Sequence, residues 1–127
     1  MYLEEAFFRA NGGSDRVTPA AFPRLEFRAE KIIDRHTFGR VRVMQNVPEA
    51  VKRLMVELVN LEQSRSEAVE TPAVKSFSND GYSESYEVIT PEQAEQMELS
   101  LICTYLSGET NDRGVPLLYL GSEEWRC

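Results

Sequence analysis

Apolar residues recur along most of the chain at spacings of three or four positions, which is the period of an amphipathic helix. One apolar stripe, continued by His36, comprises Phe22, Leu25, Ala29, Ile32 and Ile33. A second comprises Val51, Leu54, Met55, Leu58 and Leu61, and Val59 widens it, which predicts a central helix. A third comprises Ala94, Met97, Leu101, Ile102 and Tyr105, with Leu99, Cys103 and Leu106 broadening its apolar arc.

Start and stop signals divide these stripes into four predicted helices, at residues 2–10, 18–36, 48–63 and 91–107. Thr18-Pro19 and Thr90-Pro91 pair an N-cap residue with a proline suited to the first turn, and Pro48 opens the third helix. Gly12-Gly13, Gly39 and Gly108 follow helix ends, where glycine is favoured.

Two segments lack a helical stripe. Residues 64–90 form a long loop, in which weak alternation around Asp80-Gly81 predicts a β hairpin near residues 74–88. After Gly108, residues 109–114 are polar and look like a tether, and apolar residues 115–120 follow. The predicted fold is therefore mainly α: a small four-helix bundle-like domain over residues 1–108 and an extended C-terminal tail over 109–127.

Composition supports one globular domain, since 127 residues with 42% hydrophobic and 28% charged side chains match neither a disordered nor a membrane protein. The acidic start of the chain has no signal-peptide pattern. The net charge of −7 argues against a general nucleic-acid binder. Residues 1–63 hold ten Lys/Arg and nine Asp/Glu, whereas residues 64–127 hold four and twelve. In the second helix the cations Arg24, Arg28, Lys31 and Arg35 are interleaved with Glu26, Glu30 and Asp34, which predicts a face of balanced charge.

The sequence offers little catalytic chemistry. The single histidine, His36, lies near a helix end, where a core or capping role is the common one. Two cysteines, Cys103 and Cys127, cannot make a disulfide framework or a four-ligand zinc site, so a reduced chain is expected. No nucleotide-binding, zinc-protease or complete calcium-loop motif is present. We therefore predict no catalytic residue, no metal and no cofactor.

Three blocks, in this order, carry a resemblance to a known family. They are Ile33-Asp34-Arg35 through Phe38-Gly39-Arg40, Pro48 through Arg53, and Ser78 through Tyr86. With them the chain closely resembles the head–tail connector (head-completion adaptor) proteins of tailed bacteriophages and prophages. The family-motif positions are Asp34, Arg35, Phe38, Gly39 and Arg40.

The resemblance implies a structural virion protein without enzymatic activity. Such proteins are small helical bundles that form a ring under the dodecameric portal after DNA packaging and link it to the stopper or next connector. The expected partners are further copies of the chain, the portal protein and the stopper, while packaged DNA passes through without specific binding and no membrane is involved. The expected location is the virion, after synthesis in the bacterial host cytoplasm.

Two interfaces are predicted. The first is the loop, with residues Ser78, Asn79, Asp80, Gly81, Tyr82, Ser85 and Tyr86, because tyrosine suits interfaces; the alternative is a surface hairpin whose tyrosines pack back onto the bundle. The second is the tail, with residues Leu117, Leu118, Tyr119, Leu120 and Trp125. The tail either docks on its own bundle or pairs with a neighbouring subunit or the portal by strand addition.

Other interpretations stay open. A cytosolic helical regulatory or DNA-associated protein is the alternative function. The acidic second half of the chain is either a solvated face that keeps the protein soluble or the lining of a channel that repels DNA phosphates.

Overall fold

The computed structural model describes residues 1–70, 89–121 and 124–125, and its elements there are mainly helical, as predicted. They are α1 (Glu5–Ala10), α2 (Phe22–Thr37), α3 (Glu49–Glu70), α5 (Pro91–Leu106), β1 (Tyr119–Gly121) and β2 (Glu124–Trp125). The hairpin predicted at residues 74–88 lies outside the described residues.

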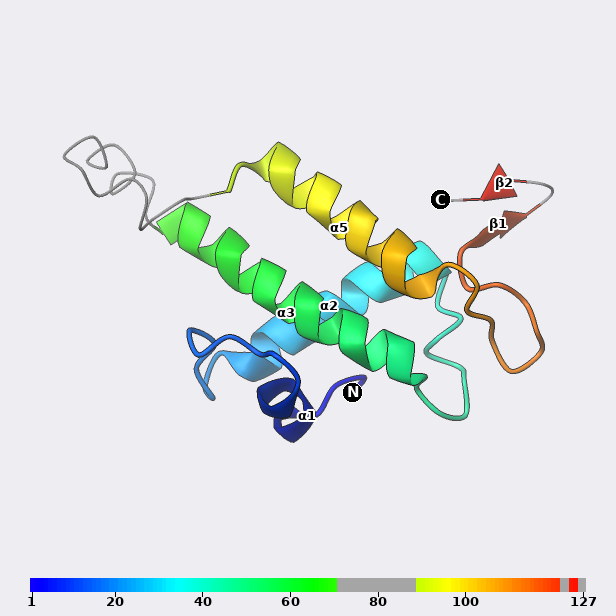
Figure 1. Cartoon of the computed structure of the whole chain (residues 1–127), viewed down its shortest axis with the longest axis horizontal. Helices are drawn as coiled ribbons and strands as arrows, with labels where there is room; N and C mark the ends of the chain where they lie inside the picture. The colour runs from blue at the N-terminus through cyan, green and yellow to red at the C-terminus, as the bar shows by residue number, and fades with distance from the viewer. Residues whose placement is uncertain (71–88, 122–123, 126–127) are drawn as a thin grey trace.

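Helix α3 is the central element, which confirms the prediction from its wide apolar face. It packs against α2, which crosses it, and against α5, which runs alongside it in the opposite direction (Figure 1). The α3 side chains predicted for the core are all buried: Val51, Leu54, Met55, Leu58, Val59 and Leu61. No helix among the described residues is both long and apolar enough to cross a membrane.

Helix α2 begins at Phe22, so the predicted start at Thr18 is wrong. The Thr18 carbonyl and hydroxyl oxygens accept from Ala21 N in a turn that precedes the helix. The reason lies in Pro23, which has no N–H and whose ring clashes with the carbonyl four residues earlier in a helix interior. Starting at Phe22 places Pro23 in the first turn, where neither effect matters.

Helix α3 continues to Glu70, seven residues beyond the predicted end at residue 63, so the loop predicted over 64–90 is wrong for residues 64–70. The added turns have few apolar side chains and are held by charge instead. Arg16 donates to Glu67 over 2.6 Å, and Arg65 donates to Glu98 of α5 over 2.9 Å. Because both partners come from other segments, the stripe of α3 alone did not indicate this extension.

Helix α5 starts as predicted. Thr90 Oγ1 accepts from Gln93 N over 3.1 Å and Gln93 Oε1 accepts from Thr90 N over 3.0 Å, which completes a capping box. Its buried face differs from the prediction, because Met97 and Leu99 are 46% and 43% exposed. The inward positions are Ala94, Glu98, Ile102 and Leu106.

The first residues of the chain lie across α2. Tyr2 N donates to the carboxylates of Glu26 and Glu30, each over 3.1 Å, and the Tyr2 hydroxyl donates to Asp34. These three acids are spaced four residues apart, so they share one side of the helix. The N-terminal segment thereby covers the acidic side of α2.

The turn after α1 depends on two glycines. Gly12 has φ of +98°, a conformation that favours glycine, and a Cβ on Gly13 would come within 2.5 Å of the Phe8 ring. Asn60 of α3 holds this turn, since its side chain accepts from Ser14 N over 2.9 Å and donates to Gly12 O over 3.1 Å.

The segment after Gly108 folds back onto the helices. Asn111 Oδ1 accepts from the backbone N–H groups of Arg113 and Val115, each over 2.9 Å, so the predicted tether at residues 109–114 is instead an ordered turn. Leu117 and Leu118 then join the hydrophobic core of the helical part. Residue 108 therefore does not separate two independently packed parts.

Candidate functional site

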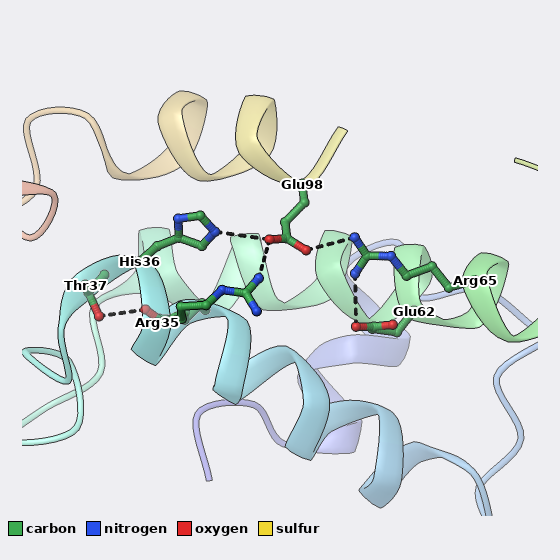
Figure 2. Close-up of polar contacts among 7 residues, drawn as sticks. Arg35, His36, Thr37, Glu62, Arg65 and Glu98 are labelled. Atoms are coloured by element: carbon green, nitrogen blue, oxygen red, sulfur yellow. Dashed lines mark hydrogen bonds and ion pairs between the residues drawn. The ribbon is translucent and has the colours of Figure 1, made fainter. Parts of the chain in front are cut away.

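A buried carboxylate, Glu98, joins the three long helices. Its Oε2 accepts from Arg35 over 2.7 Å and contacts His36 Nε2 over 3.1 Å, and its Oε1 accepts from Arg65 (Figure 2). Arg65 also donates to Glu62 over 3.2 Å. Since an ionised carboxylate only accepts hydrogen bonds, His36 donates through Nε2. His36 is buried near the end of α2, which confirms the core or capping role expected for it.

The charges of this cluster favour an ionised Glu98. Burial by itself raises the pKa of Glu98, but the hydrogen bonds from His36 and Arg65 and the nearby guanidinium charges outweigh it and lower the pKa to about 2. Burial alone would lower the pKa of Arg65, yet its contacts with Glu98 and Glu62 raise it. Glu98 is thus held ionised by its cationic partners, whereas a general acid or base has a pKa near neutral pH.

The outer face of α2 is basic, so the balanced face predicted from the sequence is wrong. The exposed positions of α2 are Pro23, Arg24, Phe27, Arg28, Lys31 and Arg35, four cations and no acid. The interleaved acids Glu26 and Glu30 are buried on the opposite side under Tyr2. Cations and acids alternate along the sequence, but the helix places them on opposite sides, and the N-terminal segment covers the acidic side.

The two buried acids under Tyr2 influence each other. Burial and a hydrogen bond with Glu30 raise the pKa of Glu26 to about 7. Burial also acts to raise the pKa of Glu30, but hydrogen bonds from Glu26 and Tyr2 N and the charge of Arg42 lower it below its ordinary value. Between about pH 4.5 and 7 the pair therefore favours one bound proton and one negative charge.

An open groove of about 1060 Å³ runs between α2 and α5, above the Glu98 cluster. Its α2 side includes Phe27, Arg28 and Lys31, and its α5 side includes Ala94, Glu95 and Leu99. Phe27 is 57% exposed, and the Lys31 ammonium lies 5.0 Å from the centroid of its ring. The groove thus presents an exposed aromatic ring beside an arginine, Phe27 and Arg28, and both residue types are enriched at protein interfaces.

The family-motif positions cluster where α2 ends. Asp34 accepts from Tyr2 and from Arg42, and Arg35 donates to Glu98. Phe38 ends the helix with φ of +58°, and Gly39 follows with φ of +74°. This reversal directs Arg40 toward the tail, where its Nη1 donates to three carbonyl oxygens, those of Pro116, Leu117 and Tyr119, over 3.2, 3.0 and 2.8 Å. The block therefore ties the N-terminal segment, α5 and the tail together.

The predicted tail interface is divided by the structure. Leu117 and Leu118 are 0% and 4% exposed and belong to the core of their own chain, as the self-docking alternative expects. Tyr119 is half-buried at the start of β1, where it is paired in register with Trp125 of β2. The side chains of Leu120 and Trp125 lie outside the described part.

The predicted loop interface, Ser78 through Tyr86, falls wholly outside the described residues, so it remains a prediction.

Cys103 of α5 is half-buried and disulfide-bonded, which contradicts the expectation of a reduced chain. In the described ranges no group of three or more His, Cys, Asp or Glu side chains is arranged to hold a metal ion.

Sequence reasoning missed the Glu98 cluster and the basic face of α2. A signal for the first was present, because Glu98 interrupts the line of Ala94, Ile102 and Leu106 at spacings of four residues. A carboxylate at such a position needs cationic partners. The basic face could be found by plotting α2 as a helix, since its cations and acids occupy opposite sides.

Comparison with protein-family models, with curated protein sequences and with solved structures finds no match for this chain.

Proposed function

We propose that this chain is a structural virion protein, a ring-forming head–tail connector that docks under the portal after DNA packaging and links it to the stopper or tail. The proposal begins from the resemblance carried by the three sequence blocks. In the virion its partners are further copies of itself, the portal and the stopper, and the hairpin and interface predicted at residues 74–88 belong to the same proposal.

The groove between α2 and α5 is the observation that carries this function. Its exposed side chains Phe27 and Leu99 place apolar surface at the edge of a small helical unit. The acidic and basic groups beneath them, centred on Glu98, neutralise one another. Such a surface supports contact with another protein better than it supports chemistry on a small substrate.

The test is electron microscopy of portal-bearing capsids incubated with the purified chain. A ring of added density beneath the portal is the expected result. Tyr82→Ala combined with Tyr86→Ala should weaken this docking and leave the helical content unchanged. Val43→Ala, at a site that is 81% exposed, is the matched control and should dock normally. The proposal is contradicted if no density is added beneath the portal at concentrations at which a head–tail connector, used as a positive control, saturates its own portal.

The second candidate is a cytosolic DNA-associated or regulatory helical protein. The basic outer face of α2 favours it, because four cations on one helix face can contact phosphates. Retention of the chain on duplex DNA, weakening steeply as salt is raised, would support this candidate. DNA binding without any association with portal-bearing capsids would replace the connector proposal by this one.

A further inference from the structure

Four cations of α2 form one continuous stripe on its exposed face. Arg24, Arg28, Lys31 and Arg35 are spaced four, three and four residues apart. At about 100° per residue they fall within an arc of about 60°. Arg24, Arg28 and Lys31 have no carboxylate partner among the residues that the structure describes, so much of this stripe's charge is uncompensated.

Helix α5 presents a stripe of the opposite character. Among its exposed positions, which also include Gln93, Met97 and Ser100, one face carries Glu92, Glu95, Gln96 and Leu99 at helical spacing. The sequence of α5, Pro91–Leu106, contains no lysine or arginine. This stripe therefore combines two carboxylates with an exposed leucine, as the α2 stripe combines cations with the exposed Phe27.

The spacings of the two stripes match in an antiparallel register. Lys31 and Phe27 are four residues apart, and so are Glu95 and Leu99. If Lys31 of one helix lies opposite Glu95 of another, Phe27 therefore lies opposite Leu99 and Glu92 comes beside Arg35. The register thus joins opposite charges and apolar side chains at the same time.

Within a single copy these groups do not meet. Lys31 and Glu95 belong to different sides of the groove, and no ion pair joins the two stripes among the described residues. A second copy of the chain supplies both complements: a carboxylate stripe for α2 and a cationic stripe for α5. Complementary charge also disfavours the wrong pairing, α2 against α2, by repulsion between like charges.

We propose that the basic stripe of α2 in one copy binds the acidic stripe of α5 in a second copy. This inference rests on the proposed function, because it supplies the subunit contact of the ring. The contact joins two different helices, so it can repeat from one copy to the next. A repeated contact of this kind can close into a ring.

The test is a charge exchange between the two stripes, read by sedimentation velocity at low salt. Lys31→Glu and Glu95→Lys should each lower the self-association constant by about tenfold or more. An equimolar mixture of the two variants should associate again. The Lys31→Glu variant keeps its acidic α5 stripe, and the Glu95→Lys variant keeps the basic α2 stripe that binds it. Arg113→Glu and Glu4→Lys, at exposed sites outside both stripes, change the net charge equally and should associate like the wild type. Raising the salt should weaken the wild-type contact.

Several outcomes overturn the inference. A wild-type chain that stays monomeric at low salt and millimolar concentration excludes the contact, as does a mixture of variants that fails to associate while both keep wild-type circular dichroism. If Lys31→Glu reduces retention on duplex DNA and leaves self-association unchanged, the stripe binds phosphates instead. The proposed function is assessed separately by docking to portal-bearing capsids. A chain that docks there without the α2–α5 contact keeps the function and loses the inference.

Discussion

The guanidinium of Arg40 and the main-chain carbonyl of Tyr119 lie 2.8 Å apart, although 79 residues of chain separate them. The same Nη1 donates to the carbonyls of Pro116 and Leu117. Backbone pairing also holds this segment, through the bridge between Thr110 and Pro116 and the pairing of Tyr119 with Trp125. The side chain of Arg40 adds a direct contact between the end of α2 and the tail.

Removing this side chain should loosen the tail. Arg40→Ala is expected to lower the free energy of unfolding by about 1–3 kcal/mol, since it removes three hydrogen bonds from a charged donor to part-buried carbonyls. Arg40→Lys should recover only part of this loss, because an ammonium lacks the planar fork of a guanidinium. Urea unfolding measures the free energy, and amide exchange at Val115 and Leu117 reports the local effect. Arg113→Ala, at an exposed site, is the control. Unchanged exchange in Arg40→Ala would show that the tail is held by other contacts.

The second prediction distinguishes the two roles weighed for the tail. Leu117 is completely buried in its own chain, so Leu117→Ala should lower the free energy of unfolding by about 2–5 kcal/mol. Val43→Ala, at a site that is 81% exposed, should change it by less than about 0.5 kcal/mol. Thermal and urea unfolding of the isolated chain provide the measurement. If Leu117→Ala left stability unchanged but abolished portal docking, Leu117 would serve a partner rather than its own core.

The third prediction concerns the loss of stability at acid pH. The pKa of Glu98 in the folded chain is about 2, below its ordinary value of 4.5. Its contribution to stability is therefore complete above pH 4.5 and is lost as the pH falls from 4.5 toward 2. Glu98→Gln should remove this dependence and cost about 2–4 kcal/mol at pH 7, because Arg65 and Arg35 lose their buried counter-charge. Urea unfolding at a series of pH values tests this; a parallel dependence in wild type and variant would contradict it.

The fourth prediction concerns Glu26, whose contribution to stability decreases as the pH rises. The folded-state pKa of Glu26 is raised from 4.5 to about 7, so the protonated form is favoured in the fold. Its contribution to stability is present below pH 4.5 and is lost as the pH rises through 7. Glu26→Gln stays neutral at every pH. The variant should match the wild type near pH 5 and exceed its stability by on the order of 1 kcal/mol near pH 8.5, because it avoids a second buried charge. Glu4→Gln, at an exposed site, should show no such difference.

Local patterns were enough to predict that the four described helices exist, but not all of their bounds: α1 begins at Glu5 rather than at residue 2, and α3 ends at Glu70 rather than at residue 63. The apolar stripe of α3 and the Thr90-Pro91 start of α5 act within one or two helical turns, and both predictions are confirmed. The start of α2 was predicted wrongly because two prolines compete as first-turn residues, and the first, Pro19, was preferred. Pro23 decides between them, because its ring would clash with the preceding turn of a helix that starts at Thr18.

The candidate site depends on contacts between distant segments, which a single sequence does not display. Tyr2 donates hydrogen bonds to Glu26, Glu30 and Asp34, which lie 24 to 32 residues further along the chain, and so covers the acidic side of α2. Only the basic side of the helix is left exposed. Likewise, Arg35 and Glu98 are 63 residues apart in the chain. Their pairing follows from the packing of α2 and α5 around α3, which fixes the positions of both side chains.

The connection between α2 and α3 is held in place by specific partners, and this limits its tolerance to insertions. It contains Arg40, which donates to the carbonyl of Tyr119, buried Val41, and Arg42, which pairs with Asp34. Extra residues in this connection would move these side chains away from the groups that they contact. A short Gly-Ser insertion between α2 and α3 should therefore lower the unfolding midpoint, although no helix is interrupted.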